Sequence, residues 1–167
     1  YFILSDVASL YPSIMIEYNF LSRNVPYPER FKEIRDKRIE LKKAKNPMQL
    51  PMKIVLNSTY GASKDKYNDL YDPLMANNVC IAGQLLILDL IEKLEFEFGD
   101  SCQLIQSNTD GILVKLNNPK DYTRYVEVCE EWCKRTRLTL EHDIYTKVIQ
   151  KDVNNYIMVD SKGNLET

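Results

Sequence analysis

Two aspartates stand where strand-like sequence gives way to a turn. Asp6 ends the apolar run that begins at Tyr1, and Asp110 lies in the turn sequence Asn108-Thr109-Asp110-Gly111 between two β-rich runs. Carboxylate oxygens are hard ligands, and two carboxylates on adjacent strand ends could bridge two Mg²⁺ ions for phosphoryl transfer. Taken alone, each aspartate is explained as a helix cap or a turn residue, so only the pair indicates metal chemistry.

A basic segment stands out in an otherwise acidic chain. The net charge is −2, whereas residues 30–45 hold eight basic and three acidic side chains, a local charge of +5. At helical spacing the basic residues of one arc are Arg35, Arg38, Lys42 and Lys45. The acidic residues of the segment share the opposite side, so the pattern predicts a helix that presents cations in one direction, with an ordinary solvated helix as the alternative.

A second chemically suggestive face follows in the next expected helix. Lys53, Asn57 and Tyr60 recur at i, i+4 and i+7, which gives one side an ammonium, an amide and a phenol. Gly61 is expected to end this helix and to allow close backbone approach.

The surrounding pattern indicates the elements that must position these residues. Five segments have helical patterns: 11–18, 28–45, 47–60, 74–98 and 121–135. Five have strand patterns: 1–5, 102–107, 112–116, 138–150 and 156–159. Their order predicts an α+β fold, in which an antiparallel sheet is backed by helices and carries an inserted helical hairpin.

Composition excludes several classes of protein. With 44% apolar and 28% charged residues, the chain is that of a folded globular domain. We expect no membrane partner, because the most apolar stretch, residues 79–90, is interrupted by Gln84 and Asp89. The four cysteines form no Cys-x-x-Cys pair, which argues against a zinc site or a disulfide framework. The single histidine, His142, is assigned no role.

Four segments resemble the motifs of family-B DNA polymerases, in the order of that family. Asp6–Ile14 resembles the first polymerase motif, and Lys53–Gly61 resembles the Lys-x-x-x-Asn-Ser-x-Tyr-Gly motif of the fingers. Asn108–Gly111 is similar to the third motif, usually Asp-Thr-Asp-Ser, and Lys151–Tyr156 to a later Lys-Lys-Arg-Tyr type segment. Together these segments span nearly the whole chain.

The resemblance implies a polymerase palm formed by residues 1–27 and 63–167, with a fingers hairpin inserted at 28–62. The exonuclease and thumb domains of such an enzyme are absent from this sequence, so we expect a catalytic portion of a longer polymerase that acts on primer-template DNA and dNTPs. The compact fingers suggest a phage or mobile-element enzyme, located in the cytoplasm of a bacterial host or phage-infected cell.

The resemblance also implies roles for individual residues. Asp6 and Asp110, with the Val7 carbonyl, would ligate two Mg²⁺ ions, for which Mn²⁺ is a possible substitute. The residues expected to bind the nucleotide are Ser9, Leu10, Tyr11, Arg38, Lys42, Lys53 and Asn57. Tyr11 would lie under the deoxyribose and exclude a 2′-hydroxyl, and Lys53 would assist catalysis. The residues expected to contact DNA are Tyr60, Gly61, Thr109, Lys151 and Tyr156.

Four positions depart from the family pattern and leave other functions open. Asn108 replaces an aspartate, Gln106 a tyrosine and Gly111 a serine, and Asn155 stands where arginine or lysine is common. A degenerate palm that serves as a structural or DNA-binding module is one alternative, which Asn108 favours slightly. A nuclease built on two aspartates is another, against which the fingers pattern argues.

Overall fold

The chain folds as two compact units. A computed structural model describes residues 1–152 and 155–166. One unit comprises Tyr1–Ala8 and Gln84–Thr167, and the other is the continuous segment Ser9–Gly83. Helix α4 (Pro73–Phe98) contributes to both. The predicted palm and fingers boundaries refer to subdomains of a polymerase and stay a prediction.

The first unit is built on an antiparallel sheet, which confirms the predicted α+β class. Among the described residues the sheet has the strand order β2-β3-β1-β4-β5-β6, with every neighbouring pair antiparallel. The strands are β1 (Phe2–Val7), β2 (Cys102–Ser107), β3 (Gly111–Leu116), β4 (Leu140–Asp152), β5 (Asn155–Asp160) and β6 (Leu165–Glu166). The short strand β6 was not predicted.

Strand β1 lies between β3 and β4 and divides its side chains between two faces. Ile3, Ser5 and Val7 are buried, and the alternate residues, which include Leu4 and Asp6, are partly exposed. This period of two places an apolar face on one side of the sheet and the Asp6 carboxylate on the other.

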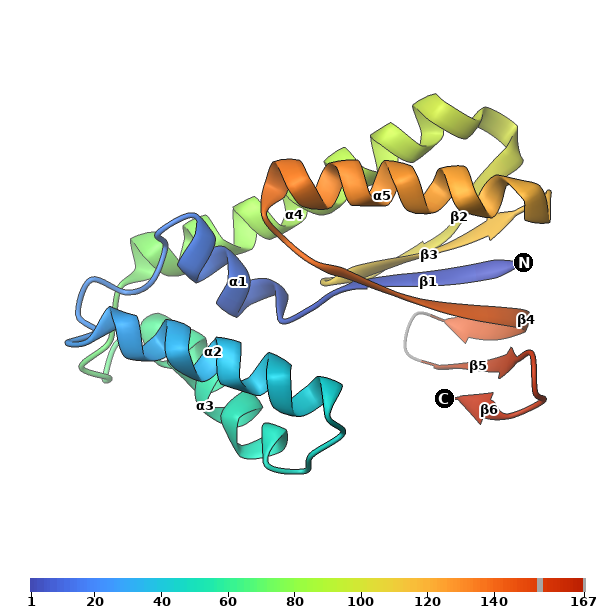
Figure 1. The fold of residues 1–167 in the computed structure, drawn as a ribbon. Helices are drawn as coiled ribbons and strands as arrows, with labels where there is room; N and C mark the ends of the chain where they lie inside the picture. Colours follow the sequence, from blue (N-terminus) through green and yellow to red (C-terminus); the bar gives the residue numbers. More distant parts are fainter. Residues whose placement is uncertain (153–154, 167) are drawn as a thin grey trace. The chain divides into compact units, whose positions relative to one another are not determined.

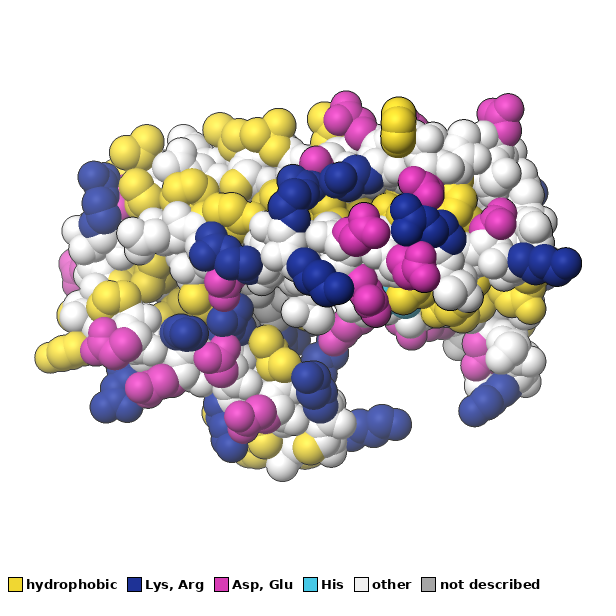
Figure 2. All heavy atoms as spheres, turned by 45° about the horizontal axis from the view of Figure 1, so that its top comes forward, with side chains coloured by type: hydrophobic (Ala, Val, Ile, Leu, Met, Phe, Trp, Pro, Cys, Tyr) yellow, Lys and Arg dark blue, Asp and Glu magenta, His cyan; other side chains and the backbone are white. Residues whose placement is uncertain are grey.

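Helices cover one face of this sheet, as Figure 1 shows for α5 (Tyr122–Thr136) and the later part of α4. The buried side of α5 carries Tyr125, Val128, Cys129 and Trp132. On the outer side, Arg124 contacts three glutamates. Basic and acidic side chains are interspersed over α5 in Figure 2. The outer surface of this covering helix therefore carries mixed charge.

A buried polar contact joins the sheet to α5. The Ser5 hydroxyl lies 2.7 Å from the Tyr125 hydroxyl and 2.8 Å from Nδ1 of His142 on β4. Ser5 and Tyr125 are fully buried, and an unsatisfied polar group in that setting would be costly. One serine thus links β1, β4 and α5.

The second unit consists of helices. These are α1 (Leu10–Glu17), α2 (Pro28–Lys43), α3 (Gln49–Lys64) and the first part of α4. Helices α2 and α3 pack against each other, and α1 contacts both (Figure 1), while the identity of this pair as a fingers hairpin stays a prediction. The buried apolar residues of this second unit include Ile14, Met15, Phe31, Leu56 and Val79.

The prediction that Gly61 ends the second helix of the hairpin was wrong. Helix α3 continues through Gly61 to Lys64. Ser63 is buried there, its hydroxyl donates to the Tyr60 carbonyl, and its carbonyl accepts the Asp72 N–H. Contacts of the last turn therefore outweigh the low helix propensity of one glycine.

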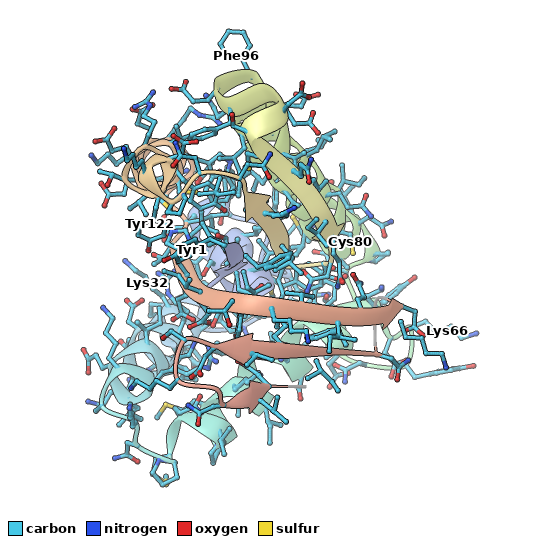
Figure 3. The ribbon with its side chains drawn as sticks, turned by 90° about the vertical axis from the view of Figure 1, so that its right-hand side faces the viewer. Tyr1, Lys32, Lys66, Cys80, Phe96 and Tyr122 are labelled. Atoms are coloured by element: carbon cyan, nitrogen blue, oxygen red, sulfur yellow. The ribbon has the colours of Figure 1, made fainter. Side chains whose placement is uncertain are left out.

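Helix α4 is long and strongly apolar. By length and composition Pro73–Ser101 could cross a membrane, with a mean hydropathy of 1.7 in its most apolar window, of which 33% is buried. One such helix is weak evidence, because the core helix of a globular protein can pass the same test. Phe96, near its C-terminal end, points away from the protein and is 92% exposed (Figure 3).

We expect the stability of the chain to fall as the pH drops through the ordinary histidine pKa of about 6.5 and below it, because burial lowers the pKa of His142 in the fold. The nearby Asp143 and Glu130 oppose this effect only in part. The unfolded chain takes up the proton first, near the ordinary histidine pKa, so protonation favours unfolding.

The expectation is checked by measuring the urea concentration at the midpoint of unfolding across this pH range. His142→Asn, which cannot titrate, should flatten the dependence. Equal slopes for the two proteins would contradict it.

Candidate active site

Strand pairing brings Asp6 and Asp110 onto neighbouring strands. Asp6 is paired with Gly111, the first residue of β3, so Asp110 immediately precedes that pair. The Val7 N–H donates to the Asp110 carbonyl at 2.7 Å. The two aspartates, far apart in the sequence, are thus held on adjacent strand ends by backbone hydrogen bonds, which is the arrangement that the metal hypothesis requires.

Asn108 holds the turn that presents Asp110. Its side-chain oxygen accepts the N–H of Gly111 at 2.7 Å and that of Asp110 at 3.3 Å. Its own N–H donates to the Gly111 carbonyl at 3.0 Å. The amide oxygen is therefore committed to the backbone of the turn, a bonding pattern that Asn and Asp share.

A pocket of about 50 Å³ opens beside Asp6 on the face of the sheet away from α4 and α5. Its walls come from four strands and the turn and are formed by Leu4, Asp6, Gln106, Asn108, Leu113, Tyr156 and Met158. A side-chain hydrogen bond from Gln150 to Gln106 ties β4 to β2 at this face. The structure thereby brings Tyr156, a predicted DNA contact, into the same pocket as Asp6.

The oxygen donors at this end of the sheet fit Mg²⁺. Asp6 and Asp110 supply carboxylates from adjacent strands, and Mg²⁺ is typically held by one or two carboxylates plus substrate phosphates and water. Within the described residues no group of three or more His, Cys, Asp or Glu side chains is arranged to hold a metal. The fit therefore rests on two carboxylates and a backbone carbonyl, and the role of the Val7 carbonyl stays a prediction.

Glu141 is a further acidic residue that sequence reasoning missed. Its Cα is paired with that of Asp6 on the side of β1 opposite Gly111, and its side chain is exposed. The strand pattern of residues 138–150 could have shown that Glu141 lies on a strand. Only the register between β1 and β4 places it opposite Asp6.

In the helical unit, Arg38 ties α2 to the start of α1. Ser9 precedes α1 in a left-handed conformation with φ 52°, and its hydroxyl accepts a hydrogen bond from Arg38. The Arg38 side chain is buried. This contact holds the turn after β1, from which the predicted nucleotide-binding amides of Ser9, Leu10 and Tyr11 project.

The expected one-directional array of cations on α2 was wrong in part. Arg35 is buried and forms ion pairs with Glu17 of α1 at 3.2 Å and with Asp36 at 2.6 Å. Together with the buried Arg38, it faces the protein, whereas Lys42 is exposed. Arginines of this arc therefore join helices, because partners from α1, distant in sequence, lie beside them.

Tyr11 is partly buried and packs against other residues of the helical unit. Its ring lies 4.5 Å from that of Tyr60, and Cys80 of α4, labelled in Figure 3, contacts both hydroxyls. A Cβ on Gly83 would lie 3.5 Å from the Tyr11 ring. Burial and the Cys80 contact raise the pKa of Tyr60, so its phenol stays neutral at physiological pH.

The remaining predicted residues are exposed. Lys53, Asn57 and Gly61 belong to α3 in the helical unit. Thr109 and Lys151 belong to the sheet unit. Residues 153 and 154 of the predicted Lys151–Tyr156 segment lie outside the described residues.

Comparisons with known proteins relate this chain to archaeal DNA polymerases. No family model matches it. The chain is 28% identical over 206 aligned positions to DNA polymerase 1 of Saccharolobus solfataricus, an alignment that covers 96% of this chain and 23% of that protein. The fold is similar to that of the family B DNA polymerase from the hyperthermophilic archaeon Pyrobaculum calidifontis, with a TM-score of 0.68 and 21% identity over 98% of this chain and 26% of that one.

These matches support a relation to DNA polymerases and show a polymerase-like fold. The chain spans about a quarter of the length of either relative. The phage or mobile-element origin stays a prediction.

Replacing Asn108 by alanine should lower the free energy of unfolding by about 1 kcal/mol, because two backbone N–H groups of the turn lose their acceptor. Asn108→Asp keeps an oxygen in place and should stay within about 0.5 kcal/mol of the original. Urea denaturation of the three proteins measures this, and equal losses for both variants would show that the amide oxygen does not hold the turn.

Proposed function

We propose that this chain is the catalytic portion of a template-directed DNA polymerase of family B, in which a primer 3′-hydroxyl attacks the α-phosphate of a dNTP and pyrophosphate leaves. The observation that carries the proposal is the pairing of β1 with β3, which sets Asp6 beside Asp110 in a chain related to DNA polymerases. Phosphoryl transfer depends chiefly on positioning and on neutralising charge, and these two carboxylates suit that task.

In the sheet unit, Asp6 and Asp110 would hold the metal ions, with the Val7 carbonyl as a further ligand. Two bound Mg²⁺ ions would supply stabilisation of the attacking and leaving oxygens. Asn108 keeps Asp110 at the tip of its turn. Tyr156, beside Asp6 in the pocket, would contact the primer-template duplex together with Lys151 and Thr109.

In the helical unit, exposed cations and amides would hold the nucleotide. Lys42 and Lys53 would bind the triphosphate, Arg38 would act through the Ser9 turn that it braces, and Asn57 would position the nucleotide. The triphosphate is a strongly charged ligand, to which the exposed ammonium groups of Lys42 and Lys53 are suited.

Tyr60 and Gly61 of the helical unit would contact the base pair that the incoming nucleotide forms with the template. Tyr11, packed against Tyr60, has the fixed ring that exclusion of a 2′-hydroxyl requires.

The partners in this proposal are primer-template DNA, dNTPs, and the exonuclease and thumb domains of a longer protein. The alternative, a degenerate palm that only binds DNA or supports other domains, rests on Asn108. Commitment of the Asn108 oxygen to the turn weakens that alternative, because an asparagine serves this purpose as well as an aspartate.

Asp110→Asn should abolish Mg²⁺-dependent primer extension and spare DNA binding, because it removes a ligand charge and leaves the shape of the turn. Loss of an outer partner of a metal ligand costs about 10- to 100-fold, so loss of a direct ligand should cost more than about 100-fold. Primer extension and DNA binding are measured with the chain and with the longer protein that contains it.

Asp100→Asn, which alters an exposed carboxylate in the 3₁₀ turn Gly99–Ser101, is the matched control and should extend primers normally. DNA binding by the longer protein without any Mg²⁺-dependent extension would favour the degenerate palm.

Tyr11→Ala should raise incorporation of ribonucleotides relative to deoxyribonucleotides by at least about tenfold, because the ring that collides with the 2′-hydroxyl is removed. Single-nucleotide incorporation with paired dNTP and rNTP substrates gives the ratio. Tyr67→Ala, at a side chain that is 86% exposed, is the control and should leave the ratio unchanged. A proportional loss with both sugars would reduce Tyr11 to a packing residue.

A further inference from the structure

Cys80 of α4 contacts the hydroxyl ends of two tyrosines that have predicted roles in the site. Its Sγ lies 2.6 Å from the Tyr60 hydroxyl and 3.9 Å from the Tyr11 hydroxyl. The centroids of the two rings lie 4.5 Å apart, and the ring planes are tilted by 52°. All three residues belong to the helical unit, so one side chain of α4 meets the ends of side chains from α1 and α3.

The thiol can link the two hydroxyls in a hydrogen-bond network. A thiol has one proton to donate and a sulfur that accepts weakly. Cys80 is the donor toward Tyr11, so the Tyr60 hydroxyl donates to the sulfur. Burial and the Cys80 contact raise the pKa of Tyr60, which means that this phenol keeps the proton that it donates. The orientation of each hydroxyl therefore depends on the same thiol.

Helix α4 also supports the Tyr11 ring one turn further along. A Cβ added at Gly83 would lie 3.5 Å from Cε1 of Tyr11, which is ordinary van der Waals contact, so the helix approaches the ring at this position. Cys80 and Gly83 are three residues apart and share one face of the helix. Tyr11 is thus held along its ring by Gly83 and Tyr60, and at its hydroxyl by the thiol.

We propose that Cys80 is a positioning residue for sugar selection, because its thiol holds the hydroxyl end of Tyr11 directly and also holds the Tyr60 ring that packs beside it. The inference rests on the proposed function, in which Tyr11 excludes a 2′-hydroxyl. Exclusion by collision requires a ring that cannot swing aside, and a displacement of about 1 Å is enough to change a reaction rate strongly. Without the thiol, Tyr11 can move at its hydroxyl end, and a ribonucleotide fits at a lower cost.

Single-nucleotide incorporation by the longer protein that contains this chain tests the proposal with paired dNTP and rNTP substrates. Cys80→Ala should lower the preference for deoxyribonucleotides by about threefold or more, the scale of one net hydrogen bond, and by less than Tyr11→Ala does. Cys80→Ser keeps a donor and an acceptor and should restore part of the preference. Cys133→Ala, at a half-buried cysteine of α5, is the matched control and should leave the preference unchanged.

A purely structural role would lower incorporation of both sugars in proportion, and that result, or an unchanged preference in Cys80→Ala, would overturn the proposal. A mutant cycle tests the thiol contact without any nucleotide. The Tm losses of Cys80→Ala and Tyr60→Phe should be less than additive in the double variant, because each single change already removes the same hydrogen bond. Additive losses would contradict the contact. Absence of any incorporation by the original protein would instead contradict the proposed function, and the cycle would still decide whether Cys80 holds Tyr60.

Discussion

The antiparallel pairing of β1 with β3 and β4 is the constraint on which the sheet unit depends. It determines which residues of β1 face the helices, and it joins Asp6 to Gly111 on one side and to Glu141 on the other. Because side chains alternate across a strand, a slip of one residue would turn Asp6 into the covered face and Ser5 out of it. The position of the candidate metal ligand is thus set by the same register that builds the core.

Polar contacts on the covered face support that register. Ser5 contacts both Tyr125 and His142, so a shifted β1 would leave buried hydroxyl and imidazole groups without partners. On the opposite face β1 and β3 approach closely at Gly111, where an added Cβ would lie 2.7 Å from the Ser5 carbonyl oxygen. Hydrogen bonding on one face and packing on the other therefore favour the same alignment.

The helical unit uses its charges in two different ways. Arg35 and Arg38 are buried and hold α2 against α1 and the Ser9 turn, while Lys42 and Lys53 are exposed. Arginine suits the first task because its planar group donates several directed hydrogen bonds, whereas a lysine ammonium suits loose contact with a charged ligand. A pattern of charge on a helix does not distinguish these uses until the neighbouring helix is known.

The α+β class and most of the helices and strands could be predicted from local periodicity and turn chemistry, and recognisable motifs suggested that Asp6 and Asp110 act together. The folded structure was needed to show that α3 runs past Gly61, that Arg35 and Arg38 are buried, and that Gly111 and Glu141 flank Asp6. Each of these depends on contacts between segments far apart in the chain, and local sequence carries no record of which distant atoms fill the space around a residue.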